Sequence, residues 1–427
     1  MRILIANHQF FPAFYTGTER FSFNIAKQLQ RMGHYVEIVT YGVVDNPDDY
    51  VDEYLSIKWR EYVFSGIRVT AIRHRKMPAE LNSRIFDEGV YRFFTDFLGK
   101  KQFDLVHVAH PMRTGSAANA ARQMGIPVIL TLTDFWLLCP SATLLKADFS
   151  LCTSPRKGKA CCEICFAPSM GDSLEKRFAE GEKYLQMMDG IFAPSNFLIQ
   201  MFQKSIPDVF INLIRHGIDY SKGVCPKADV RSSGRKLTFG FIGTILKHKG
   251  LETVVRAFQK VAAEDVRLDI YGGCFHETQY YAELLKTAKN DGRIRFLGEY
   301  RHDELSAILS GMDFVVVPSL WWENSPLTVL TSLAHRTPVI VSDIGGLKEF
   351  VQHDVNGYRF AMGDADALAA LIDRIASDRT IVKNLCRQIQ LPPRIEEEAF
   401  QYEMVYQGIL RKPAGQAITL SPKFHGQ

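Results

Sequence analysis

The loop from Gly243 to Gly250 combines its glycines with Lys247, His248 and Lys249, directly before a predicted helix. Free N–H groups at a helix start, the helix dipole and a lysine ammonium all favour an anion. Gly243 and Lys247 are therefore candidate contacts to a phosphate. The same pattern also fits an ordinary strand-to-helix turn with solvated lysines, so both interpretations stay open on this loop alone.

A second candidate region surrounds Glu323 and Asn324, which lie between a predicted strand and a predicted helix. Ser325 and Pro326 have the residue types of an N-cap and a first helical position, so we expect the helix to start there. Glu323 can accept hydrogen bonds from sugar hydroxyls, and the unpaired amides around Leu327 can donate to a phosphate. A simple helix cap beside two packed tryptophans is the alternative interpretation.

The third candidate is a cysteine cluster, since five of the eight cysteines lie between residues 139 and 165. Cys162 and Cys165 form a C-x2-C pair, and Cys139 and Cys152 can complete a four-thiolate set that binds zinc, with Cys161 as a further ligand candidate. We therefore predict a structural zinc site. Free thiols in an ordered loop and an iron–sulfur cluster are the alternatives.

Alternating strands and helices must position these residues. Buried strands at the start of the chain and again after residue 236 are each followed by a loop, an amphipathic helix and another strand. Such βαβ repeats predict an α/β protein with two Rossmann-like, doubly wound sheets that face a cleft, with ligands beyond the carboxyl ends of the strands. The predicted strands are residues 2–7, 35–39, 104–108, 127–132, 191–194, 210–214, 237–242, 267–271, 293–297, 314–318 and 338–342, and the main helices are 19–32, 116–124, 252–263 and 395–410.

Shifts in composition divide the chain into domains. The polar stretch before residue 237 is typical of a linker, and two prolines at 392 and 393 break the chain before its last helix. The predicted divisions are an N-terminal domain at 1–220 with a Cys-rich insert at 139–165, a linker at 221–236, a C-terminal domain at 237–392, a helix at 393–411 and a tail at 412–427.

Charge and hydropathy limit the partners and the compartment. A net charge of +4 over 427 residues, without a basic stripe, argues against nucleic acid. The chain starts without a signal-peptide pattern and has no apolar run long enough to cross a bilayer, so we expect a cytoplasmic protein.

Residues 58–101 carry ten Lys or Arg against five Asp or Glu, together with many aromatic residues. A basic, aromatic segment of this kind can bind peripherally at the anionic inner face of a membrane. The interpretation we favour is an amphipathic helix with a solvated basic face. Its apolar side would pack into the core through Phe86, Val90, Phe93, Phe94 and Phe97.

Motifs along nearly the whole chain resemble those of the retaining family-4 glycosyltransferases. They are, in order, Gly17-Thr-Glu-Arg20, Gly33-His34, Lys249-Gly250, Pro318-Ser319, Glu323, Pro338-Val339-Ile340, Gly345-Gly346 and Asn356-Gly357-Tyr358. The resemblance implies the GT-B fold, with the nucleotide sugar held by the C-terminal domain and the acceptor by the N-terminal domain, to which the last helix returns. It also implies catalysis without a metal.

The resemblance assigns roles to individual residues. Lys249 is similar to the lysine that meets the donor diphosphate, and Glu323 to the first glutamate of an E-x7-E motif that contacts the donor sugar. Asp134 resembles the aspartate of a His-Asp pair at the catalytic site, and Gly17 matches a glycine loop under the donor. His110, which follows a predicted strand, is a further candidate on the acceptor side.

Three residues depart from the family pattern. Thr244 stands in place of an arginine, Thr331 in place of the second glutamate of E-x7-E, and Thr133 in place of the histidine before Asp134. A neutral hydrogen bond from Thr331 to a ribose contributes about 0.5 to 1.5 kcal/mol, against about 1.5 to 3 kcal/mol for a charged one. Thr244 and Thr331 remain candidate donor contacts. The departures favour, as an alternative, a catalytically silent homologue that binds a glycan or activates a partner.

The function expected from this resemblance is transfer of a sugar from a UDP- or GDP-sugar to a hydroxyl of a glycan or lipid-linked glycan. Polysaccharide or lipopolysaccharide synthesis is the expected context, by analogy with the family. Same-face transfer relies on positioning and on electrostatic stabilisation of the departing phosphate, so Lys249 should matter most. A sugar-nucleotide epimerase or a phosphorylase of the same fold is a further alternative.

Overall fold

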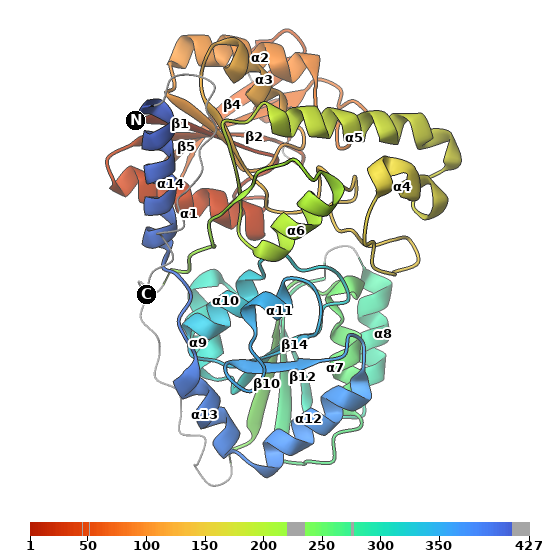
Figure 1. The fold of residues 1–427 in the computed structure, drawn as a ribbon. Helices are drawn as coiled ribbons and strands as arrows, with labels where there is room; N and C mark the ends of the chain where they lie inside the picture. The colour runs from red at the N-terminus through yellow and green to blue at the C-terminus, as the bar shows by residue number, and fades with distance from the viewer. Residues whose placement is uncertain (45, 51, 220–234, 275–276, 412–427) are drawn as a thin grey trace. The chain divides into compact units, whose positions relative to one another are not determined.

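The computed structural model describes residues 1–44, 46–50, 52–219, 235–274 and 277–411 (Figure 1). It divides into two compact units: unit 1 contains residues 1–217 and the segment from residue 395 onward, and unit 2 contains residues 218–394. Each unit has its own β-sheet with helices on both faces, which confirms the predicted α/β class. Residues 221–234 of the predicted linker and the predicted tail at 412–427 lie outside the described residues.

Within the described residues, the sheet of unit 1 has nine strands in the order β3-β4-β5-β2-β1-β6-β7-β8-β9. In this spatial order, every neighbouring pair from β5 through β2 and β1 to β9 is parallel, as the βαβ pattern predicts. The pairs β3–β4 and β4–β5 are antiparallel. The strands are β1 (Arg2–Asn7), β2 (Tyr35–Tyr41), β3 (Asp52–Tyr54), β4 (Ile57–Phe64), β5 (Ile67–His74), β6 (Leu105–Val108), β7 (Val128–Thr131), β8 (Gly190–Ala193) and β9 (Asn212–Leu213).

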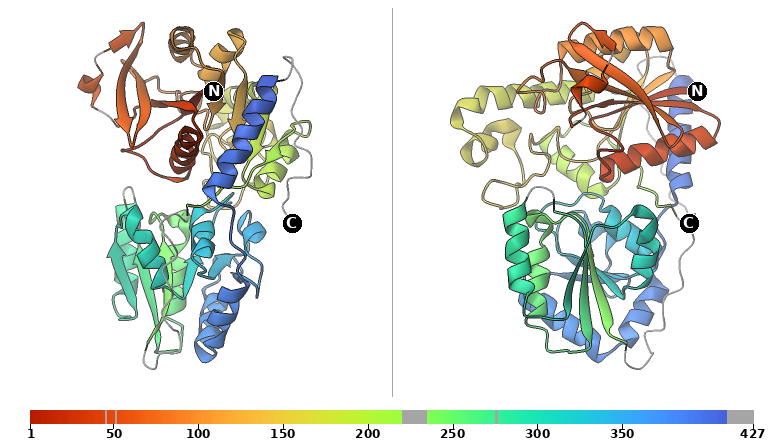
Figure 2. Two further views of the ribbon diagram at one scale, coloured as in Figure 1. Left: turned by 90° about the vertical axis from the view of Figure 1, so that its left-hand side faces the viewer. Right: turned by 180° about the vertical axis from the view of Figure 1, so that it is seen from behind.

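The antiparallel extension β3–β5 at one edge of this sheet is absent from the sequence prediction (Figure 2). The basic, aromatic segment 58–101 therefore divides into two strands and the helix α2 (Glu88–Lys101). That helix buries Val90, Phe93, Phe94, Phe97 and Leu98, which accounts for most of the predicted apolar stripe. Phe86 is an exception, because it precedes the helix and is 42% exposed, so its assignment to the core was wrong.

The remaining helices of unit 1 include the last helix of the chain. Unit 1 contains α1 (Gly17–Arg31), α2, α3 (Ser116–Gln123), α4 (Lys159–Ile164), α5 (Gly171–Gln186), α6 (Asn196–Ser205) and α14 (Ile395–Arg411). In Figure 1, α14 lies beside α1 and the sheet. Tyr402 and Tyr406 on α14 are fully buried, and their hydroxyls hydrogen-bond Thr131 Oγ1 at 2.9 Å and His107 Nδ1 at 2.8 Å. These buried contacts, 271 or more residues apart in sequence, attach the helix to the sheet of unit 1.

Unit 2 is built on a parallel sheet with the strand order β12-β11-β10-β13-β14-β15. Its strands are β10 (Leu237–Ile242), β11 (Val266–Tyr271), β12 (Ile294–Gly298), β13 (Phe314–Val317), β14 (Val339–Ser342) and β15 (Gly357–Phe360). Its helices are α7 (Leu251–Phe258), α8 (Thr278–Ala288), α9 (Leu305–Ser310), α10 (Leu327–Ala334), α11 (Leu347–Phe350), α12 (Ala365–Ser377) and α13 (Thr380–Gln388). The central strands are fully buried, as expected for a parallel sheet covered on both faces.

Local chemistry explains where the helix boundaries differ from the prediction. Helix α1 begins at Gly17, two residues early, because Thr16 and Glu19 form a capping box at its start. Helix α7 ends at Phe258, before the predicted end at 263. No helix in the described part of the chain is long and apolar enough to cross a membrane.

Candidate functional site

In unit 2, the loops after β10, β13 and β14 approach each other so closely that two glycines are required. Gly250 has a φ of +73°, and a Cβ there would lie 2.0 Å from the carbonyl oxygen of Pro318. A Cβ on Gly346 would lie 2.2 Å from the carbonyl oxygen of Asn324, and the Gly346 N–H donates to the Glu323 carbonyl at 2.8 Å. The close approach fixes the backbone around Glu323 against two neighbouring loops.

Lys249 and Glu323 form an ion pair at this strand edge. Lys249 Nζ lies 2.7 Å from Glu323 Oε1, and the same oxygen accepts hydrogen bonds of 2.8 Å from Ser319 Oγ and Trp321 Nε1. Glu323 is 7% exposed. Burial alone would raise the pKa of this carboxyl, but Lys249 and the two hydrogen bonds lower it on balance. A buried, ionised carboxylate thus holds the lysine in place.

The Trp321 ring, one of the two tryptophans expected to pack beside the helix start, extends this arrangement. Lys249 Nζ lies 4.7 Å from the centre of the Trp321 ring, and the His248 ring meets the same indole at 5.0 Å in an edge-on arrangement. Burial, together with the adjacent Lys249, lowers the pKa of His248 to about 4. His248 is therefore neutral at physiological pH, and the lysine supplies the positive charge beside the indole.

The start of α10 differs by one residue from the prediction. Pro326, with an extended ψ of 105°, is the N-cap, and the helix begins at Leu327, so Ser325 does not cap it. The Ser325 hydroxyl is buried without a hydrogen-bond partner, while its N–H donates to Asn324 Oδ1. Thr331 lies half-buried one turn along the helix. An unpaired hydroxyl and free amides therefore meet at the helix N-terminus, beside Glu323.

The remaining candidate donor residues lie on the loop after β10. Gly243 donates its N–H to the Tyr271 carbonyl at 3.0 Å, and Thr244 is half-buried next to it. Lys247 has an exposed side chain, and its N–H donates to Glu277 Oε2 at 2.6 Å. All three residues lie on the same loop as Lys249.

In unit 1, the corresponding strand edge brings together His110 and Asp134. His110 follows β6, Asp134 follows β7, and His110 Nε2 lies 2.9 Å from Asp134 Oδ2. The other ring nitrogen of His110 accepts the Met112 N–H at 3.2 Å, and Asp134 Oδ1 accepts the Trp136 N–H at 2.8 Å. The His110 side chain is 2% exposed and that of Asp134 is 29% exposed. The histidine therefore faces the aspartate, and the aspartate is the member that faces solvent.

His8 is a member of this edge that the sequence analysis missed. Its ring lies 4.1 Å from the His110 ring, centre to centre, and its Nε2 lies 3.7 Å from Glu19 Oε1. Burial, and then the neighbouring His110 and Arg113, lower the pKa of His8 well below its usual value. Its place directly after β1, matching that of His110 after β6, is the signal that could have found it.

The glycine loop at the start of α1 lies at the same edge. Thr18 Oγ1 hydrogen-bonds Thr133 Oγ1 at 3.0 Å, so the loop that contains Gly17 is attached to the end of β7. Glu19 is fully buried, and burial raises the pKa of its carboxyl. The threonine that replaces a family histidine thus has a structural partner in this chain.

The cysteine cluster does not form the predicted metal site. Within the described residues, no group of three or more His, Cys, Asp or Glu side chains is placed to hold a metal ion, so zinc is not supported. Cys139, Cys152, Cys161 and Cys165 line a pocket of about 240 Å³, whereas Cys162 Sγ lies beside Gly171. Helix α4 turns Cys161, not Cys162, toward the other thiols. Burial and the neighbouring thiols raise the pKa of Cys161 to about 12.

Comparisons with known proteins agree with this architecture. Residues 15–222 match the family Glycosyltransferase Family 4, and residues 236–378 match Glycosyl transferases group 1. The N-acetyl-alpha-D-glucosaminyl L-malate synthase of Bacillus anthracis is 28% identical over 91% of this chain and 92% of its own length. The amylovoran biosynthesis glycosyltransferase AmsK of Erwinia amylovora is 28% identical over 39% of this chain and 42% of its own.

Among solved structures, the Anabaena protein HepE in complex with UDP and glucose superposes with a TM-score of 0.69 at 15% identity, covering 95% of this chain and 99% of its own. This likeness confirms the GT-B fold. With both halves of the sequence matched and both sheets in place, the chain belongs to glycosyltransferase family 4, the group 1 glycosyltransferases that use nucleotide-sugar donors.

Proposed function

We propose that this protein is a retaining glycosyltransferase that moves a sugar from a UDP- or GDP-sugar to a hydroxyl of a glycan or lipid-linked glycan in cell-surface polysaccharide synthesis. The observation that carries the proposal is the 2.7 Å pair of Lys249 with the buried Glu323 beside the N-terminus of α10. UDP is bound by the Anabaena protein of the same fold, and amylovoran synthesis is named for the Erwinia relative.

Unit 2 supplies the groups that the donor needs. Lys249, the free amides at the start of α10 and the unpaired Ser325 hydroxyl would stabilise the diphosphate as it departs. Glu323 has one oxygen occupied by Lys249, Ser319 and Trp321, and its other oxygen can accept hydrogen bonds from the donor sugar. The charge that develops on the leaving phosphate thus meets a cation already in position.

Unit 1 supplies the groups that the acceptor needs. Asp134 has a partly exposed carboxylate that can accept a hydrogen bond from the acceptor hydroxyl, and His110 and the Trp136 N–H hold that carboxylate in place. The imidazoles of His8 and His110 and the hydroxyl of Thr133 lie around it. Such a surface suits a polyol, whose hydroxyls need hydrogen-bond partners rather than opposite charges.

Thermal unfolding in the presence of UDP-, GDP-, ADP- and dTDP-sugars tests the donor. A donor at about 100 times its Kd should add about 2.7 kcal/mol to the unfolding free energy, and this gain should vanish in Lys249→Ala. Transfer is then measured with glycan acceptors, and with L-malate because the Bacillus relative is a malate synthase. If no donor shifts the melting temperature, the proposal is overturned.

A catalytically silent homologue is the second candidate, because Thr331 places a hydroxyl on α10 where the family pattern has a carboxylate. This candidate predicts donor or glycan binding without turnover. Wild-type protein that binds a donor but neither hydrolyses nor transfers its sugar, with any acceptor in the panel, would favour it.

A further inference from the structure

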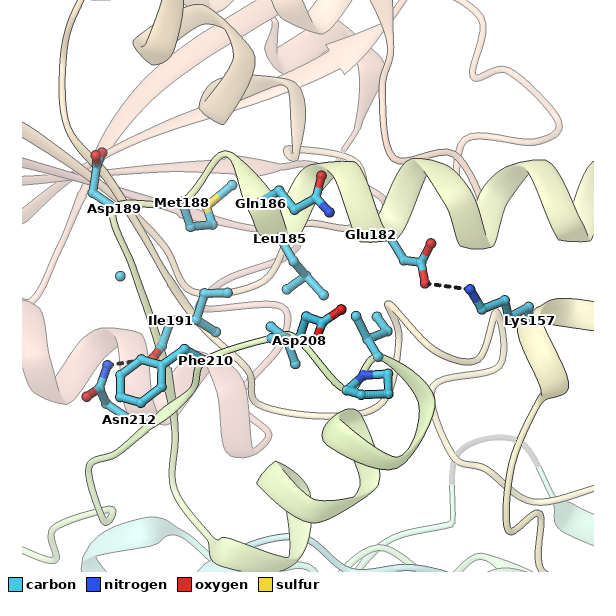
Figure 3. A pocket seen from close by; sticks show the side chains of 14 residues that line it. Lys157, Glu182, Leu185, Gln186, Met188, Asp189, Ile191, Asp208, Phe210 and Asn212 are labelled. Atoms are coloured by element: carbon cyan, nitrogen blue, oxygen red, sulfur yellow. Dashed lines mark hydrogen bonds and ion pairs between the residues drawn. The ribbon is translucent and has the colours of Figure 1, made fainter. Parts of the chain in front are cut away.

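A pocket of about 370 Å³ opens in unit 1 (Figure 3). It is lined by the end of α5, the amino-terminal ends of β8 and β9, and the loop of residues 206–210 between α6 and β9. Since the strands are parallel, His110 and Asp134 follow their carboxyl ends, at the other edge. The volume falls in the usual range of about 300 to 1,000 Å³ for ligand sites.

The charges around this pocket argue against the nucleotide donor as its ligand. Glu182, Asp189 and Asp208 line it together with Lys157, whose Nζ lies 3.4 Å from Glu182 Oε1. Asp189 is also neutralised, because both of its oxygens accept from Arg122 Nη1 at 2.9 and 3.0 Å. No spare cation therefore faces the pocket among the described lining residues, and a diphosphate would meet the free Asp208 carboxylate.

The groups that remain free are those that recognise a sugar. The Phe210 side chain is 52% exposed at the mouth of the pocket, although aromatic rings usually gain by burial. Gln186 and Asp208 are exposed and, within the described part of the chain, have no hydrogen-bond partner. A flat apolar ring and nearby amide and carboxylate groups match the C–H face and the hydroxyls of a pyranose.

From this arrangement we propose that the pocket binds a neutral sugar residue of a glycan, separately from the transfer site. A cationic ligand fits less well, because Glu182 and Asp189 are already paired with Lys157 and Arg122, which leaves Asp208 as a single carboxylate for it in the described structure. A site of this kind keeps a glycan chain bound to the enzyme while the end of that chain leaves the acceptor site near Asp134. The inference concerns binding alone, so it stands or falls independently of the proposed transfer.

The test uses the full chain and an array of neutral oligosaccharides, including maltohexaose, cellohexaose and chitohexaose. Glycans retained on the array are titrated by calorimetry without any donor present. Phe210→Ala should weaken binding about tenfold, the loss of about 1.4 kcal/mol that one aromatic contact supplies. Phe400→Ala is the matched control, since Phe400 is 53% exposed on α14, also in unit 1, and lies outside the pocket.

Two further variants separate this site from its alternatives. The tenfold loss caused by Phe210→Ala should be the same in an Asp134→Ala background, because Asp134 lies at the other edge of the sheet. Asp208→Asn should keep most of the affinity for a sugar, since an amide still hydrogen-bonds hydroxyls. The proposal is overturned if the array retains no glycan, or if wild type and Phe210→Ala bind equally at matched melting temperatures. It is also overturned if Phe210→Ala has no effect in the Asp134→Ala background.

Discussion

The two units place very different chemistry at the carboxyl ends of similar parallel sheets. In unit 2 the edge carries an ion pair, Lys249 with Glu323, and the carboxylate is buried. In unit 1 the edge carries two buried imidazoles, His8 and His110, and the partly exposed carboxylate of Asp134. The topology fixes where the ligand groups stand, and the loop residues decide which chemical groups the ligand meets.

Under the proposed function, each edge serves one half of the transfer reaction. A cation held by a buried carboxylate, beside free helix amides, is prepared for an anion before it arrives. A carboxylate oriented by a histidine and a backbone N–H is prepared for a neutral hydroxyl. If this comparison is right, substitutions at the two edges should affect different steps.

The largest expected effect is at Lys249. Lys249→Ala should lower turnover by about 10² to 10³-fold, the usual cost of losing one group that stabilises developing negative charge. It also leaves Glu323 buried without its cation, which should lower the unfolding free energy by about 1 to 3 kcal/mol. The double variant Lys249→Ala/Glu323→Gln should recover that stability but not the turnover. Steady-state kinetics and urea unfolding measure both quantities.

The matched control for this prediction is Lys286→Ala, an exposed lysine on α8 of the same unit. It should change neither turnover nor stability. If Lys249→Ala keeps wild-type turnover, the ion pair has no part in catalysis. The contrast between the two edges would then have no bearing on the reaction.

At the edge of unit 1 we expect a smaller effect and a different signature. Asp134→Asn should lower kcat by about 10²-fold, since a neutral amide accepts a weaker hydrogen bond from the acceptor hydroxyl than a carboxylate does. His110→Gln should cost about tenfold, because glutamine can still donate to Asp134 while holding it less firmly. Neither variant should reduce the donor-induced shift in melting temperature. Equal losses of kcat in the two variants would show that His110 does more than hold Asp134 in position.

Much of the fold could be predicted, because strand and helix patterns are local. Most of the parallel strands of both units and the helix α14 lie within a few residues of their predicted ranges, but β15 at the edge of the unit 2 sheet was missed. Strands β3, β4 and β5 were also missed. The exposed β3 and the partly exposed β4 lack a clear apolar alternation, whereas β5 is mostly buried and its apolar residues are interrupted by Arg68, Thr70 and Arg73. Phe86 was misplaced because the start of α2 depends on the Asp87 cap, which accepts from Val90 N.

Less of the candidate site could be predicted, because its contacts join residues distant in sequence. Lys249 and Glu323 were each named, but their pairing depends on two loops meeting 74 residues apart. Trp321 and Ser319 contact Glu323 from its own loop, two and four residues away, but loop spacing does not predict that their side chains turn toward the carboxylate. The C-x2-C spacing was misleading, since it does not specify which face of the short helix α4 turns toward the other thiols. Residue spacing predicts which side chains share a face of one helix or strand. It does not predict which neighbouring element that face contacts.

The last prediction concerns stability rather than turnover, and is a pH dependence that distinguishes the two edges. The pKa of His248 is about 4 in the folded protein and near 6.5 when unfolded. Between pH 6.5 and pH 4 the unfolded chain binds a proton that the folded chain does not, so stability falls as the pH falls. One such group contributes a slope of at most about 1.4 kcal/mol per pH unit. Urea unfolding at pH 7, 6 and 5 measures this slope, which should be flatter in His248→Gln.

Added UDP sharpens this prediction. A bound diphosphate beside Lys249 favours the protonated form of His248, so UDP should flatten the slope of the wild type further than that of His248→Gln. His8→Gln at the other edge should also flatten the slope without UDP, because the pKa of His8 is lowered by burial too. However, UDP should still flatten the slope of His8→Gln, since its His248 is intact. If UDP acts equally in wild type and His248→Gln, then the anion does not bind beside His248, and the charge difference between the two edges is not what selects the donor.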